Sequence, residues 1–153
     1  MRTMETKDEF IKGVIAGAIG SLLLFLFVQA FNLLSLIKYD QFRLAGEVVF
    51  NYQPNLFNKF IGFFMTIALG AFWGIILAFV FTKLLNGNFY ILKGIVFAFS
   101  IFILNLGFLD VVFQYPKDLH DSSLNILVFL LGYCIYGITT AIILKRLGIF
   151  ENG

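Results

Sequence analysis

The sequence predicts an all-α polytopic membrane protein in which four transmembrane helices form an up-down bundle. Three long stretches, residues 13–37, 60–82 and 122–144, contain no charged residue, and residues 94–116 contain only Asp110. A helix needs about 20 mostly apolar residues to cross roughly 30 Å of hydrocarbon. Hydrophobic residues make up 60% of the chain and charged residues 13%, whereas soluble domains average about 45–50% and about 25%.

Composition also limits the organisation and the partners of the chain. Four spans leave little chain for a soluble domain, so we expect one integral membrane domain over residues 1–153 in contact with the lipid bilayer. No basic patch is interleaved with polar or aromatic residues, and we therefore expect no nucleic-acid partner. The single Cys134 provides neither an intrachain disulfide nor a metal framework.

The first helix is expected over about residues 8–37. Asp8 and Glu9 suit a helix start, because their negative charge favours the positive end of the helix dipole. A cleaved secretory signal is the alternative interpretation, with residues 28–30 as a passable cleavage site. The apolar run continues well beyond these residues, however, and this length favours a retained helix.

The other three helices are bounded by turn-forming residues. We expect the second helix over about 56–85, ended by Asn-Gly-Asn at 86–88, because glycine and asparagine tolerate the left-handed conformation that ends helices. The third is expected over 93–115, since Pro116 forces its predecessor out of helical geometry. The fourth is expected over 123–147.

The distribution of basic residues predicts the orientation. Cytoplasmic ends of membrane helices carry an excess of lysine and arginine. With both termini cytoplasmic, seven basic residues lie inside and four outside. The inner set is Arg2, Lys7, Lys12, Lys83, Lys93, Lys145 and Arg146, and the outer set is Lys38, Arg43, Lys59 and Lys117. We therefore expect a multi-pass protein of the plasma membrane; the richness in Phe, Ile, Leu and Asn suits a bacterial source of low GC content.

A faint internal repeat favours two tandem αα-hairpins. Residues 12–15 resemble residues 93–96 at an offset of 81 positions, and residues 73–78 resemble residues 136–141 at an offset of 63. Two spans per unit would make the repeats parallel rather than inverted. Chance similarity between sequences built from Phe, Leu, Ile and Gly is the alternative.

Small residues recur every four positions within the expected helices. Such residues stack on one face and let backbones approach closely, which drives helix association in lipid. The pattern predicts packing faces against a helix of this chain or of another copy, whereas Phe25 is expected to face lipid. The candidate packing residues are Gly13, Gly17, Ser21, Gly70, Gly74, Ala78, Gly94, Ala98, Gly137 and Ala141.

Few polar side chains lie at membrane depth, and Asn105, Asp110 and Gln114 are the candidate intramembrane polar residues. Asn105 is expected to hydrogen-bond between helices. Asp110 lies near the expected end of the third helix, where it reaches interfacial water; a hydrogen bond to Gln29 and a functional ionisable site are the alternatives. Tyr133 and Tyr136 are expected in the helix core, with hydrogen bonds across the bundle to Asn105 or Thr66 as the alternative.

The sequence contains no nucleophile–base pair, no phosphate-binding glycine loop and no cofactor fingerprint. We therefore predict no catalytic residues, no cofactor and no metal site; Asp118, His120 and Asp121 near Asp110 are expected to be solvated rather than metal ligands. The predicted function is an accessory or structural role in packing with itself, as a homo-oligomer, or with a larger membrane complex. A small transporter or channel subunit acting as an oligomer is the second hypothesis, and a membrane enzyme is the third.

Overall fold

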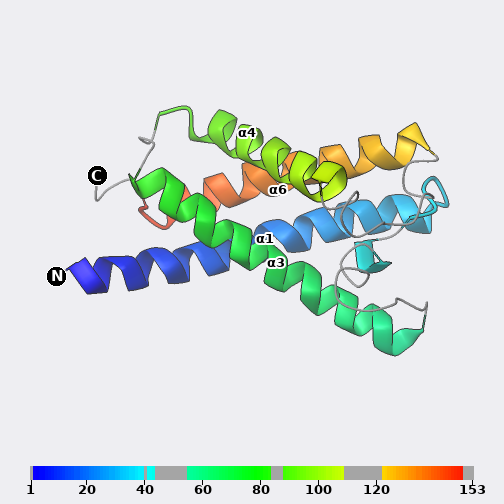
Figure 1. Cartoon of the computed structure of the whole chain (residues 1–153), viewed down its shortest axis with the longest axis horizontal. Helices are drawn as coiled ribbons and strands as arrows, with labels where there is room; N and C mark the ends of the chain where they lie inside the picture. The colour runs from blue at the N-terminus through cyan, green and yellow to red at the C-terminus, as the bar shows by residue number, and fades with distance from the viewer. Residues whose placement is uncertain (1, 40, 44–54, 84–87, 109–121, 150–153) are drawn as a thin grey trace.

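The computed structural model describes residues 2–39, 41–43, 55–83, 88–108 and 122–149, with the side chains of residues 2–6 and 108 left aside. Its elements are α1 (Arg2–Leu33), α3 (Leu56–Lys83), α4 (Tyr90–Ile103), the π-helix η1 (Leu104–Phe108) and α6 (Ser123–Arg146), as Figure 1 shows. The described part contains no strand, so the predicted all-α class is confirmed.

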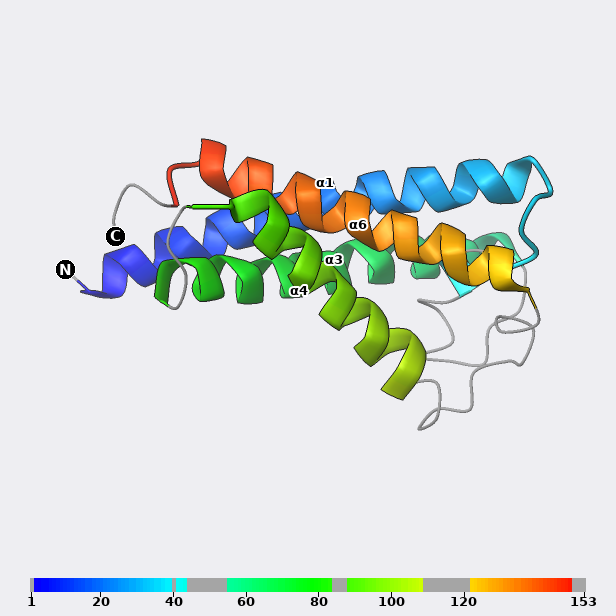
Figure 2. The ribbon, with the colours of Figure 1, turned by 90° about the horizontal axis from the view of Figure 1, so that it is seen from above.

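Four of these segments are long and apolar enough to cross a membrane: Lys7–Leu33, Leu56–Lys83, Tyr90–Gly107 and Ser123–Arg146. α1 and α4 run in one direction, and α3 and α6 run in the other (Figure 1). α1 packs against both α3 and α6, and α4 packs mainly against α6. In Figure 2, α4 leans away from its neighbours toward the end of the molecule where α6 begins.

α1 ends at Leu33, four residues before the expected position, because the backbone turns at Ser35. Ser35 has a positive φ of 56°, in the left-handed region that ends helices. The amide of Leu36 then donates to the carbonyl of Phe31 at 3.1 Å, which satisfies a carbonyl in the last turn. The helix therefore ends at a serine, which seldom adopts this conformation, rather than at a glycine, and the sequence gives only a weak signal for such an end.

α6 ends in the same way with a glycine. Gly148 has a φ of 72°, and the amide of Ile149 donates to the carbonyl of Leu144 at 3.1 Å. Ile149 then packs in a core cluster with Leu144. The helix end therefore agrees with the expected end near residue 147 to within one residue.

The third helix begins earlier than expected and changes its helical geometry before it ends. α4 begins at Tyr90 rather than at residue 93, directly after Phe89, which has a φ of 54°. Its α-helical geometry ends at Ile103 and continues as the π-helix η1 to Phe108. The expected stop at Tyr115 and Pro116 lies outside the described residues.

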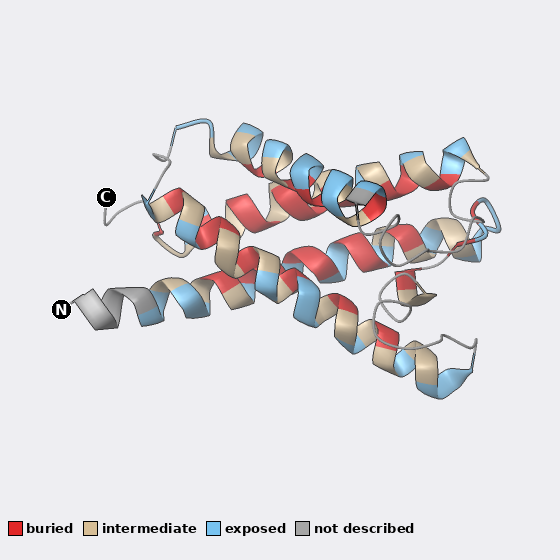
Figure 3. Cartoon of the chain, in the orientation of Figure 1, coloured by how far each residue is buried: buried red, intermediate tan, exposed pale blue. Residues whose placement is uncertain are grey.

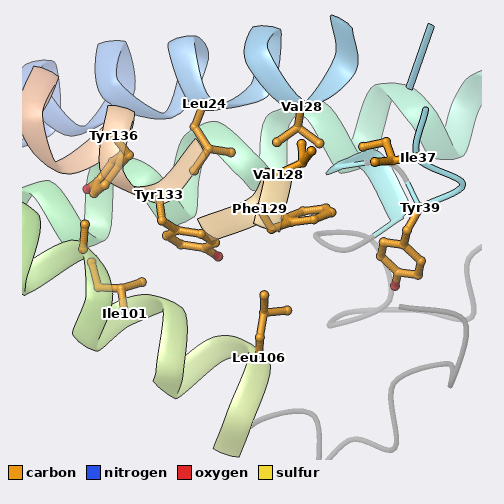
Figure 4. Close-up of a cluster of buried hydrophobic side chains, with 11 residues drawn as sticks. Leu24, Val28, Ile37, Tyr39, Ile101, Leu106, Val128, Phe129, Tyr133 and Tyr136 are labelled. Atoms are coloured by element: carbon orange, nitrogen blue, oxygen red, sulfur yellow. The ribbon is translucent and has the colours of Figure 1, made fainter. Parts of the chain in front are cut away.

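Buried side chains follow the inward faces of the helices, and exposed ones follow the outer faces (Figure 3). The larger cluster joins α1, α4, η1 and α6, with Leu24, Val28, Ile101, Leu106 and Phe129 pointing toward one another in Figure 4. The smaller cluster, around Leu77, Phe81 and Leu144, joins α3 and α6 with Ala16 of α1.

The expectation that Phe25 faces lipid is wrong. Phe25 is 7% exposed and makes edge-on ring contacts with Phe42 and Phe63, at centroid distances of 4.8 and 5.1 Å. Residues 41–43 lie against the second half of α1, and this segment covers a face that the helical pattern alone leaves open to lipid.

Candidate functional site

The first candidate site is the crossing of α1 and α3, where glycines of the two helices touch. A Cβ placed on Gly13 would lie 2.6 Å from the Cα of Ile75, and one on Gly17 would lie 2.8 Å from the Cα of Gly74. Such distances are shorter than real Cβ contacts, so only glycine permits this approach. A Cβ on Gly70 would likewise overlap the side chain of Ser21. These two small-residue faces meet within one chain.

The second candidate site is the crossing of α4 and α6. A Cβ on Gly94 would lie 2.5 Å from the carbonyl oxygen of Gly137 and 2.8 Å from the Cβ of Ala141. A Cβ on Gly137 would lie 2.7 Å from the Cβ of Ala98. All four candidate packing residues of these helices therefore lie in one crossing. Ala78, by contrast, lies in the smaller core cluster.

Close approach of this kind supplies dispersion contacts that replace the hydrophobic effect in lipid. Each crossing allows one packing arrangement of its two helices, because sliding one helix along the other would place a larger side chain against the backbone of its partner. Both crossings therefore fix the relative position of two antiparallel helices.

A buried hydrogen bond joins α6 to the first crossing. The hydroxyl of Tyr136 donates to the backbone carbonyl of Gly70 at 2.8 Å. Gly20 of α1 makes room for this tyrosine, since a Cβ on Gly20 would lie 3.0 Å from Tyr136 Cδ2. Gly20 is not among the packing residues predicted from the sequence. Ala16 and Gly20 lie four residues apart and form a second small-residue face on α1. This spacing is the feature of the sequence from which the packing role of Gly20 could have been predicted.

A second interhelical hydrogen bond joins η1 to α6. Asn105 Nδ2 donates to the hydroxyl oxygen of Tyr133 at 3.0 Å, so the expected interhelical bond of Asn105 is present. Thr66, by contrast, donates to the carbonyl of Gly62 on its own helix at 2.9 Å. Asn105 lies within the π-helix, a distortion that recurs at functional sites.

The family of the chain can be stated with these contacts in place. A family model matches residues 7–150, which cover all four apolar helices from Lys7 onward. The chain belongs to DUF6789, a family of unknown function. No curated protein and no solved structure matches the chain.

Thr140 Oγ1 is fully buried beside Gly20, next to the hydroxyl of Tyr136. Two buried amide oxygen atoms in the described part of this DUF6789 member have no hydrogen-bond partner: Gln29 Oε1 and Gln41 Oε1. Unpaired buried acceptors cost free energy, and ordered water commonly satisfies them. These atoms are the polar groups that a water molecule or a small donor would bind.

The remaining candidates of this DUF6789 chain lie elsewhere. Asp110, Gln114, Asp118, His120 and Asp121 fall outside the described residues, so the predictions about them stay predictions. Across the ranges that the structure describes, no group of three or more His, Cys, Asp or Glu side chains gathers as metal ligands would.

Proposed function

We propose that this DUF6789 protein is an integral membrane protein with an accessory or structural role, packing with itself or with a larger membrane complex. The observation that supports this role is the set of hydrogen bonds that the buried polar side chains make. Tyr136 and Asn105 join helices, and Ser21 and Thr66 donate to carbonyls of their own helices. Polar groups that tie helices together suit a scaffold better than a pathway for a polar substrate.

We also infer that the fold consists of two tandem hairpins, α1–α3 and α4–α6. At the offset of 81 residues Gly13 corresponds to Gly94, and at the offset of 63 residues Gly74 corresponds to Gly137. The spatial contacts follow the same correspondence: a Cβ on Gly74 would meet the carbonyl of Gly13, and one on Gly137 would meet the carbonyl of Gly94. Matching sequence and contacts support duplication over chance similarity.

The small-residue faces of the helices pack against one another within the chain. Association with a partner would therefore use other helix faces. The outer face of α4 exposes Leu92, Val96 and Ile103, and the outer face of α1 exposes Ile15 and Leu26. Either face offers a regular apolar row to a second helix, and either also suits lipid.

A small transporter or channel subunit acting as an oligomer is the second candidate. The π-helix at Asn105 and the unpaired amide oxygen of Gln29 favour it, because distorted helices and unpaired buried acceptors occur where a membrane protein binds a polar ligand. A membrane enzyme has no supporting arrangement among the described residues.

Photo-cross-linking in native membranes tests the accessory role. A photoreactive residue is placed at Val96, at Leu26 or, as a matched control, at the buried Val128. We expect cross-links to a second copy or to another membrane protein from Val96 or Leu26, and none to another protein from Val128. A monomer without cross-linked partners from either exposed face, also monomeric in native mass spectrometry, contradicts the accessory role.

A further inference from the structure

The basic residues at one end of the molecule are arranged differently in the two hairpins. This end, called here the lysine end, is where α1 and α4 begin and where α3 and α6 finish (Figure 1). In the α1–α3 hairpin, acids of the first turns of α1 pair with the cations. Lys12 Nζ lies 2.6 Å from Asp8 Oδ2, and Lys83 Nζ lies 3.6 Å from Glu9 Oε1. Lys12 and Lys83 are therefore each paired with an acid of the same hairpin.

The α4–α6 hairpin carries aromatic residues at the corresponding places. The offset of 81 residues puts Phe89 opposite Asp8 and Tyr90 opposite Glu9, and the offset of 63 residues puts Arg146 opposite Lys83. Lys145 Nζ lies 4.4 Å from the ring centroid of Tyr90 rather than beside an acid. Lys145 and Arg146 are exposed and form no ion pair among the described residues.

An apolar surface begins immediately beside these two cations. Along α4, Ile91, Leu92 and Val96 are exposed within the first two turns, on the side of the helix that no other described element covers. A cationic rim above an exposed apolar helix face matches the two parts of a phospholipid, the charged headgroup and the acyl chains. A soluble anion would match the rim alone.

We propose that the α4–α6 side of the lysine end binds an acidic phospholipid, with Lys145 and Arg146 contacting its phosphate and the acyl chains lying along α4. Arginine presents a fork of donors that fits phosphate oxygens, and lysine adds a mobile point charge. Tyr90 holds the Lys145 ammonium at the level of the helix end by a cation–π contact. On the α1–α3 side, Asp8 and Glu9 pair with Lys12 and Lys83, and this side is expected not to select such a lipid.

This inference rests on membrane insertion as proposed above, but not on the accessory role. Extraction of membranes with alkaline carbonate separates the two: release of the protein into the soluble fraction contradicts membrane insertion itself, and retention leaves the lipid site to be judged by lipid binding. Retention in the pellet is the expected result.

The lipid test uses the full chain reconstituted in vesicles of equal parts phosphatidylglycerol and phosphatidylethanolamine, followed by native mass spectrometry of the bound lipids. We expect phosphatidylglycerol to be enriched about fivefold or more. The double variant Lys145→Gln with Arg146→Gln should lose this enrichment. Its control, Lys12→Gln with Lys83→Gln, removes the same charge at the same end and should keep it.

A second variant transfers the acids of the first hairpin to the second. Phe89→Asp with Tyr90→Glu leaves both cations in place but gives them internal partners, so phosphatidylglycerol enrichment should again disappear. Equal loss of enrichment in the Lys12 and Lys83 control, or unchanged enrichment in both α4–α6 variants, overturns the proposal. Binding of millimolar inorganic phosphate to the unaltered protein in detergent, with no phosphatidylglycerol enrichment in vesicles, identifies a free-anion site instead and also overturns the proposal.

Discussion

At the scale of single residues, Tyr136 has the most constrained environment among the tyrosines of the described helices. Its hydroxyl donates to a backbone carbonyl on α3, while its ring lies against Gly20 of α1. The side chain of Tyr136 in α6 therefore contacts both helices of the first crossing, α1 and α3. A buried hydroxyl that lost this acceptor would remain unsatisfied in the helix core.

Replacing Tyr136 by phenylalanine removes the hydroxyl and keeps the ring. We expect a loss of about 1 kcal/mol in the free energy of unfolding, because interhelical hydrogen bonds in membranes contribute about this amount or less. Tyr133→Phe is the matched control and should cost less, since its partner Asn105 is only partly buried. Unfolding in mixed detergent micelles with increasing dodecyl sulfate measures both, and a larger loss for Tyr133→Phe would contradict this ranking.

The interhelical hydrogen bond of Asn105 could be predicted because Asn105 and Tyr133 are both polar side chains, and the sequence places them at similar positions along their helices. The hydrogen bond from Tyr136 to Gly70 could not be predicted, because its acceptor is a backbone carbonyl and every residue has one. Phe25 was misplaced for a related reason: phenylalanine suits lipid and core equally, and only the position of Phe42 decides between them.

At the scale of helices, the two glycine crossings determine how the elements pack. Glycine normally weakens a helix relative to alanine by roughly 0.5–1 kcal/mol in water. Four glycines at the two crossings, Gly13 with Gly74 and Gly94 with Gly137, meet backbone at distances that exclude a Cβ. The gain from close packing offsets the propensity lost at these positions.

Gly17→Ala and Gly137→Ala should each destabilise the protein by about 1–3 kcal/mol, the usual cost of overpacking. Alanine is the better helix former, so a loss of stability in these variants can only come from the crossing. Gly107→Ala is the control, because a Cβ there would meet only Ile103 Cγ2, at an ordinary 3.8 Å. Thermal melts in detergent decide the matter: equal melting temperatures for all three variants would mean that the crossings tolerate a wider separation.

The existence of the four helices could be predicted from the sequence, but only some of their boundaries could. α3 and α6 begin at Leu56 and Ser123 as expected, whereas α1 begins at Arg2 rather than near residue 8. α6 ends beside Gly148 as expected, whereas α1 ends at Leu33 because Ser35 adopts a conformation that serine seldom takes. The π-helix η1 could not be predicted from the hydrophobic pattern. One widened turn rotates the following residues about the helix axis but does not change their composition.

At the scale of the whole molecule, the alternating direction of the helices puts the start of α1, the end of α3, the start of α4 and the end of α6 at one end (Figure 1). Six basic residues whose side chains the structure describes gather there, namely Lys7, Lys12, Lys83, Lys93, Lys145 and Arg146. Because basic residues favour the cytoplasmic side, the charge distribution and the helix directions together predict a single orientation.

Cysteine labelling in intact cells tests that orientation. With Cys134 replaced by alanine, single cysteines are placed at Asn88, before α4 at the lysine end, and at Ser123, in the first turn of α6 at the opposite end; both positions are exposed. A membrane-impermeant maleimide should label Ser123→Cys and leave Asn88→Cys unlabelled until the cells are permeabilised. The paired positions control for reactivity, since each becomes accessible in broken cells. Labelling of Asn88→Cys alone in intact cells would invert the orientation and place Lys145 and Arg146 against the outer leaflet. Labelling of both positions would contradict the predicted single orientation.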